Sequence, residues 1–166
     1  MIRKIIVVLG ILLFSITSFA DYMPEYSLND LVQMSPFIIR GHVMEINYHA
    51  YDEITHTPFT VITIKIDNSI KGGLEKNATY EIVQLGGFSP FGTYGFIAGA
   101  PRFIKGEDII VFSRKVNIDG FGTFHVITAF SQSIFRIKNN KVFRTQHSCL
   151  MLEGIKSDLP PLIGQL

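Results

Sequence analysis

The sequence predicts a mainly β protein, built as a small barrel with one short N-terminal helix. Three observations carry this prediction. Residues 59–70 alternate strictly, with Thr60, Ile62, Ile64 and Ile66 on one face, as in a strand that has one face in a core. Residues 109–112 form a continuous apolar run, typical of a strand buried on both faces and here expected to be central. Turn residues such as Gly72-Gly73 and Gly106 separate the apolar segments.

The first twenty residues have the features of a secretory signal peptide. Arg3 and Lys4 form a positive start, residues 5–14 are apolar, and Ser18-Phe19-Ala20 places small residues at a cleavage position. The apolar run is shorter than the roughly 20 residues of a membrane-spanning helix, although an uncleaved anchor is the alternative. We therefore expect a chain that is secreted or periplasmic after cleavage near Ala20, with no stable membrane anchor.

Residues 21–166 are expected to form a single domain, since this length suits one core. The formal net charge of the whole chain is +1, which is unlike the strongly basic surface of a nucleic-acid binder. Cys149 is the only cysteine, so no intramolecular disulfide can form. The core alone must stabilise the fold, and 14 Phe residues supply it amply.

The N-terminal helix is predicted over residues 28–34. Ser27 is suited to cap it, and Asp30 places a negative charge in its first turn. Leu28, Leu31 and Val32 fall on one helical face, and Pro36 ends the helix because the residue before a proline avoids the α region.

The strands follow in order along the chain. Gly41, inside the first strand, indicates a bulge of the kind that barrel closure requires. Asn139-Asn140 is expected to be the turn of a late hairpin, and Pro160-Pro161 prevents a long C-terminal helix, so the tail is predicted to be irregular from about residue 147. The predicted strands cover residues 37–48, 59–70, 79–85, 107–115, 124–130, 134–137 and 142–145.

The loop of residues 86–103 is the best candidate for a binding surface. It is long, rich in glycine and without a regular period, and loops of that length are often functional. Aromatic side chains spaced by glycines can stack on sugars or anchor a protein partner. The alternative is a loop that folds back and caps the barrel with its own Phe side chains. The predicted partner-binding residues are Phe88, Phe91, Tyr94, Phe96 and Arg102.

No catalytic, metal or cofactor site is predicted. The five histidines (His42, His49, His56, His125 and His147) show no HExxH spacing and are interpreted as scattered strand or surface residues. Cys149 lacks a recognisable nucleophile signature. Asp52-Glu53 and Glu107-Asp108 are adjacent on strands or loops, so their side chains should point to opposite faces and form no acid/base pair.

Three motifs carry a resemblance to a known family: Phe37-x-x-Arg40-Gly41-His42-Val43, then a Lys71-Gly72 turn, then Gly99-x-Pro101-x-Phe103-x-x-Gly106-Glu107. Across about residues 30–135 the chain resembles small exported bacterial proteins that are similar to the netrin-like domain of tissue inhibitors of metalloproteinases. The resemblance implies a five- or six-stranded OB-like Greek-key barrel. The inhibitory mechanism of that family depends on an N-terminal cysteine, whereas this chain would begin Asp21-Tyr22-Met23 after cleavage.

The function predicted from the sequence is that of an exported, non-enzymatic binding protein. It would engage a protein or polysaccharide partner, but no nucleic acid, through the aromatic glycine-rich loop. Two alternatives remain open: an inhibitor of an extracellular protease, which rests on the resemblance alone, and a small hydrolase with an unrecognised site.

Overall fold

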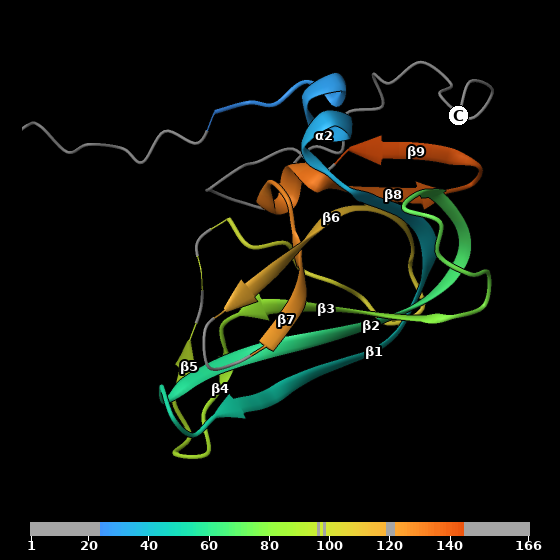
Figure 1. The fold of residues 1–166 in the computed structure, drawn as a ribbon. Coiled ribbons are helices and arrows are strands. Elements are labelled where there is room, and N and C mark those ends of the chain that lie inside the picture. Colours follow the sequence, from blue (N-terminus) through green and yellow to red (C-terminus); the bar gives the residue numbers. More distant parts are fainter. Residues whose placement is uncertain (1–23, 96, 98, 119–121, 145–166) are drawn as a thin grey trace, which may run out of the picture.

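The structure is a computed structural model that describes residues 24–95, 97, 99–118 and 122–144 (Figure 1). The predicted signal peptide, the tail from residue 147 and Cys149 lie outside the described residues. The elements are α2 (Leu28–Met34), β1 (Phe37–Asp52), β2 (Thr57–Lys71), β3 (Thr79–Leu85), β4 (Gly87–Phe88), β5 (Tyr94–Gly95), β6 (Asp108–Ile118), β7 (Gly122–Ile127), a 3-10 helix η1 (Phe130–Ser133), β8 (Ile134–Lys138) and β9 (Lys141–Arg144).

The fold is mainly β, as predicted. One antiparallel sheet contains seven strands in the order β3-β2-β1-β6-β8-β9, and β7 also pairs with β6. Strands β4 and β5 form a separate two-stranded hairpin. The prediction that residues 109–112 lie in a central strand is confirmed, because β6 pairs with β1, β7 and β8. Its seven strands correspond to the seven ranges predicted from the sequence, whereas the resemblance implied a barrel of five or six strands.

Helix α2 has the predicted bounds. Ser27 Oγ accepts a hydrogen bond from the Asp30 backbone N–H at 3.1 Å, and the Asp30 carboxylate accepts one from the Ser27 backbone N–H at 3.0 Å. This reciprocal capping box satisfies two backbone donors that the first turn would otherwise leave unpaired. Leu31 is fully buried, so the helix packs its apolar face on the sheet.

The β1–β2 hairpin is longer than predicted. Residues 49–58 were expected to be a loop, but both strands continue as a ribbon and only residues 53–56 form the turn. The sequence does not reveal this extension, because its residues are mostly polar. A two-stranded ribbon that projects beyond the core buries neither face and therefore needs no hydrophobic alternation. Gly41 allows close approach of the two strands: a Cβ there would lie 2.2 Å from the Lys65 carbonyl oxygen. The ladder is irregular beside it, as expected for a bulge.

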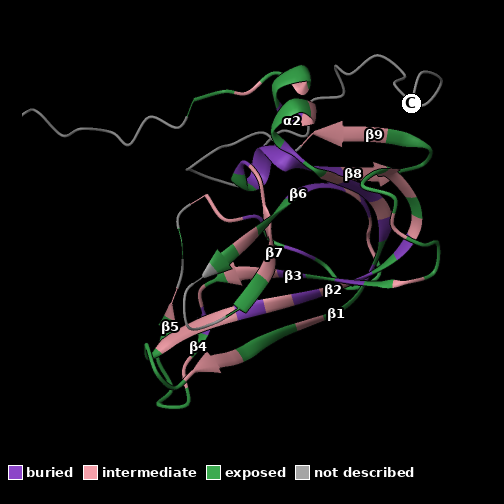
Figure 2. Cartoon of the chain, in the orientation of Figure 1, coloured by how far each residue is buried: buried purple, intermediate pink, exposed green. Residues whose placement is uncertain are grey.

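The sheet is buried on both faces near its centre (Figure 2). One face packs a hydrophobic cluster that we call the inner cluster, which contains the predicted Ile62, Ile64 and Ile66. The other face packs a second cluster, the outer cluster, which includes Leu31 of α2, Phe112 of β6 and Phe135 of β8. Because successive residues of a strand point to opposite faces, Ile39 enters the inner cluster and Ile38 the outer one. Within the described residues, no helix has both the length and the apolar character needed to span a membrane.

Side chains link β3 to β7, which the backbone ladders described do not pair. The Tyr80 hydroxyl of β3 lies 2.5 Å from His125 Nδ1 of β7 and 2.7 Å from Ser113 Oγ of β6. Burial raises the pKa of Tyr80 to about 12, although the hydrogen bond with Ser113 acts in the opposite direction. Tyr80 therefore stays a neutral hydroxyl, able to donate to His125 and accept from Ser113.

This link predicts a pH dependence of stability. Desolvation, and to a lesser degree the Lys115 ammonium, hold the pKa of His125 below the ordinary histidine value of 6.5. At a pH between the His125 pKa of the folded chain and that of the unfolded chain, the unfolded chain binds more protons. The free energy of unfolding should therefore fall as the pH drops below about 6.5. Urea unfolding from pH 8 to pH 5 measures this. The fall should be smaller in His125→Gln; equal falls in both proteins would contradict the assignment to His125.

Candidate functional site: an exposed aromatic patch

The β4–β5 hairpin lies against the far end of the β1–β2 hairpin, at the opposite end of the molecule from α2 (Figure 1). The contact is close. A Cβ on Gly87 would lie 2.6 Å from the Tyr48 carbonyl oxygen, and Gly87 has a φ of 156°. Gly86 donates its backbone N–H to the Pro58 carbonyl at 3.0 Å and accepts a hydrogen bond from Thr60 Oγ1 at 2.7 Å. The first part of the predicted loop is therefore docked on strands β1 and β2.

Docking brings five aromatic rings of the loop and β1 together. The rings of His49 and Phe88 stack, with their centroids 5.1 Å apart. The rings of Phe88 and Tyr94 are tilted relative to each other, with their centroids 4.7 Å apart. Tyr51 contacts Phe91 edge to face at 6.3 Å. His49 and Tyr51 are two residues apart on β1, beside a register shift between Asn47 and Ala50, so the two groups of rings stand at the same end of the β1–β2 hairpin. We call this set, His49, Tyr51, Phe88, Phe91 and Tyr94, the aromatic patch.

The aromatic patch is open to solvent. The exposed fractions are 80% for Phe91, 52% for Tyr94 and 39% for Phe88. Phe103, at the end of the same loop, is instead buried in the inner cluster. The four described aromatic residues of the loop are thus divided: Phe103 closes the core, as the alternative interpretation expected, and the other three stand outside it.

The other two predicted binding residues are not placed in the patch. Phe96 lies outside the described residues. Arg102 is exposed beside Phe103, near the other end of the loop sequence, and its carbonyl oxygen accepts a hydrogen bond from Arg136 Nη2. Sequence reasoning missed His49 and Tyr51, which it had assigned to a polar loop. No local pattern marks them, because a register shift between Asn47 and Ala50 interrupts the regular ladder of β1 there.

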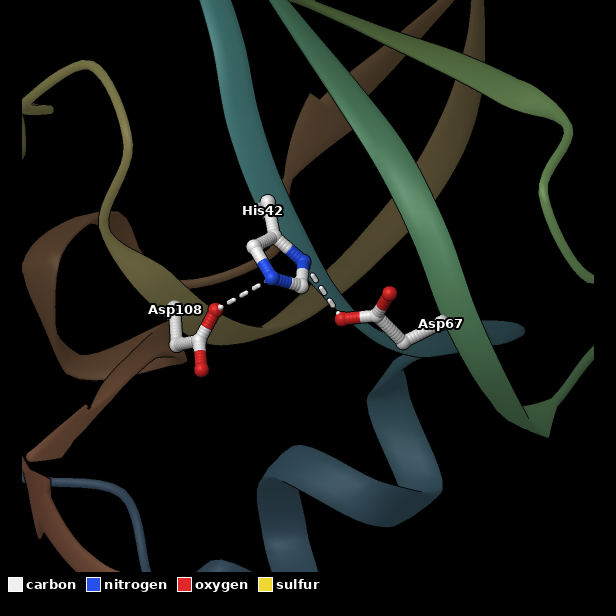
Figure 3. A group of neighbouring side chains, drawn as sticks. All are labelled: His42, Asp67 and Asp108. Atoms are coloured by element: carbon white, nitrogen blue, oxygen red, sulfur yellow. Dashed lines mark ion pairs between the residues drawn. The ribbon is translucent and has the colours of Figure 1, made fainter. Parts of the chain in front are cut away.

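A second group of side chains gathers on the outside of the sheet (Figure 3). His42 of β1 lies between Asp67 of β2 and Asp108 of β6, with Nδ1 2.6 Å from Asp67 Oδ2 and Nε2 3.1 Å from Asp108 Oδ1. Among the described residues, this is the only group of three or more His, Cys, Asp or Glu side chains that could hold a metal ion. The sequence prediction contained no metal site. The members are distant in sequence, and only the pairing of β1 with β2 and β6 reveals their proximity.

Two further sets of polar side chains among the described residues lie apart from the patch. Ser113, beside Tyr80 and His125, is fully buried, so its hydroxyl cannot reach a substrate in solution. Glu107 and Asp108 contact different partners, Arg136 and His42, as expected for neighbours on a strand. Comparison with known proteins adds no assignment, since no protein-family model, curated protein or solved structure matches the chain.

Proposed function

We propose that this chain is an exported, non-enzymatic binding protein that engages a protein or polysaccharide partner through the aromatic patch. The observation that carries the proposal is the exposure of Phe88, Phe91 and Tyr94 on a backbone that is firmly docked. Large exposed apolar groups gathered at one place are typical of an interaction site. Rings already held against one another lose little conformational freedom when a partner binds.

The proposed architecture behind this site is an OB-like Greek-key barrel. The order β3-β2-β1-β6-β7 supports it, because these strands leave β3 and β7 as the two edges that would meet. The Tyr80–His125 contact joins those edges through side chains. In OB folds the connection between the first two strands belongs to the binding surface. The aromatic patch contains the end of that β1–β2 hairpin.

The composition of the patch favours a protein partner over a polysaccharide. Sugars need several hydrogen-bonding groups beside the rings, but Phe88 and Phe91 have none, and the Tyr51 hydroxyl already lies 3.1 Å from His56 Nδ1. Only Tyr94 and His49 offer such groups within the patch. His49 also covers one face of Phe88. Aromatic anchors surrounded by other apolar groups are the usual centre of protein interfaces.

The test is a triple substitution, Phe88→Ala, Phe91→Ala and Tyr94→Ala. Pull-downs against extracts of host cells and culture medium, and against immobilised polysaccharides, should recover a partner with the unaltered protein. The triple variant should lose it, with affinity at least 100-fold weaker, since anchor residues often contribute 2 kcal/mol or more each (about 30-fold each). The far-UV circular dichroism should not change, because the rings are outside the core.

The matched control carries the same number of substitutions at exposed apolar residues elsewhere: Met34→Ala, Met44→Ala and Ile104→Ala. This control should retain the partner. Equal recovery by the patch variant would place the interaction elsewhere. Unfolding of the patch variant would instead show that the loop belongs to the core. Recovery of a polysaccharide but no protein would reverse the preference between the two partner classes.

A further inference from the structure

We propose that His42 and Asp108 bind a divalent transition-metal ion of the Zn²⁺ class, with Asp67 orienting the histidine. This inference is independent of the aromatic patch. It rests on the convergence of three side chains from three neighbouring strands, shown in Figure 3.

The sheet register places the three residues together. His42 is directly opposite Asp108 in the β1–β6 ladder and opposite Lys65 in the β1–β2 ladder. Asp67 lies two residues after Lys65, on the same face of β2. Because these strands are centrally paired, their backbone positions do not depend on a loop. Sites that stand on rigid strands hold their ligands more exactly in place than sites on loops do.

Asp67 determines which nitrogen of His42 is available. A carboxylate 2.6 Å from Nδ1 accepts the proton of that nitrogen. In neutral imidazole the other nitrogen, Nε2, then carries the lone pair. A carboxylate that receives the second N–H of a histidine is the usual companion of a metal-binding histidine, because it fixes the tautomer and the ring orientation.

The lone pair of Nε2 then faces a second anion rather than a donor. Asp108 Oδ1 lies 3.1 Å away. When the His42 ring is neutral, no proton lies between these two electron-rich atoms, and a cation bound to both removes their repulsion. Two ligand atoms about 2.1 Å from one metal are roughly 3.0 Å apart at a 90° angle and about 3.4 Å apart at a tetrahedral angle. The observed separation falls within that range.

The surroundings leave positions for further ligands. The side chain of His42 is 47% exposed and each aspartate side chain 32% exposed, so water or a partner's group can complete the coordination. One imidazole nitrogen with carboxylate oxygens suits Zn²⁺ and its neighbours better than Ca²⁺ or Mg²⁺, which prefer oxygen ligands alone. Lys65 is exposed and directly opposite His42 in the β1–β2 ladder, so its positive charge should lower the affinity of the group for a cation.

Zinc titration followed by calorimetry tests the site. The untagged protein carries Cys149→Ser, which removes a thiol able to bind zinc elsewhere. One Zn²⁺ should bind saturably, and Mg²⁺ should not displace it. His42→Ala and Asp108→Asn should each abolish binding, whereas Asp67→Asn should weaken it 10- to 100-fold, as loss of an orienting carboxylate does. His56→Ala, which replaces an exposed histidine in the turn between β1 and β2, is the matched control and should leave the zinc affinity unchanged.

A second measurement locates the ion without relying on loss of function. Mn²⁺ added to ¹⁵N-labelled protein should broaden the amide signals around residues 42, 67 and 108 and spare those of the aromatic patch. The proposal is overturned if no saturable zinc binding occurs, if His42→Ala binds as tightly as the parent, or if the broadening centres elsewhere. Without zinc binding, His42 would serve only to link β1 to the carboxylates on β2 and β6. A greater loss in Asp67→Asn than in Asp108→Asn would overturn the assignment of ligand and orienting residue.

Discussion

Replacing Glu107 by Ala should lower the free energy of unfolding by about 3 kcal/mol, near the lower end of the range for breaking a buried ion pair. Glu107 Oε2 lies 2.9 Å from Arg136 Nε, and the two side chains are only 11% and 16% exposed, respectively. Its other oxygen accepts the Ile104 backbone N–H at 2.8 Å. The substitution therefore removes the Glu107 carboxylate from the Arg136 guanidinium and releases the turn that leads into β6.

Chemical denaturation measures this effect. Glu81→Ala removes an exposed carboxylate from β3 and should change stability by no more than about 0.5 kcal/mol. In Glu107→Ala, Arg136 keeps its hydrogen bond to the Arg102 carbonyl, so the loss of stability should not exceed about 5 kcal/mol. Adding Arg136→Met to Glu107→Ala should restore part of the stability, because the guanidinium charge is gone. If Glu107→Ala alone is as stable as Glu81→Ala, the Glu107–Arg136 ion pair contributes nothing to stability.

Replacing Gly41 by Ala should lower stability by about 3 kcal/mol, at the upper end of the usual cost of overpacking. The added Cβ would meet the Lys65 carbonyl oxygen at 2.2 Å and Ile64 Cγ2 at 2.8 Å. Backbone atoms cannot rotate away as a flexible side chain would, so β1 must separate from β2. That separation would also disturb His42 and Asp67, which lie directly beside it.

Gly95→Ala is the control for this substitution. Gly95 also lies in a strand, but its nearest neighbour to an added Cβ is Pro58 Cγ at 3.4 Å, which is an ordinary contact. Its effect should stay within about 1 kcal/mol. Comparison of the two unfolding midpoints separates the clash from the general effect of losing a glycine. Equal midpoints would show that the close approach of β1 and β2 is not needed for the fold.

Local pattern was enough to predict most elements of the core. Helix α2 and strand β3 have the predicted bounds, because a capping residue, a proline and strict alternation act within a few residues. The Asn139-Asn140 turn is confirmed, with both residues at positive φ. Patterns failed where burial does not impose a period. The ribbon end of β1 and β2 was assigned to a loop, and the short β4–β5 hairpin was not predicted.

The candidate site could be predicted only in part for the same reason. Phe88, Phe91 and Tyr94 were chosen because aromatic side chains spaced by glycines in a long loop can stack on sugars or anchor a protein partner. Whether such rings enter the core or remain outside depends on where the loop docks, and Phe103 shows that the same loop does both. His49 was not chosen because nothing in its immediate sequence distinguishes it from other polar residues.

The sequence by itself determined the mainly β class, the capped helix and the inward-facing isoleucines, since each follows from interactions between residues close along the chain. The tertiary structure alone decided the seven-strand order, the Glu107–Arg136 and Tyr80–His125 contacts, and the meeting of His42 with Asp67 and Asp108. These depend on which strands pair and in which register. Register is determined by the burial of whole faces and by close approaches such as that at Gly41, and no local pattern records it.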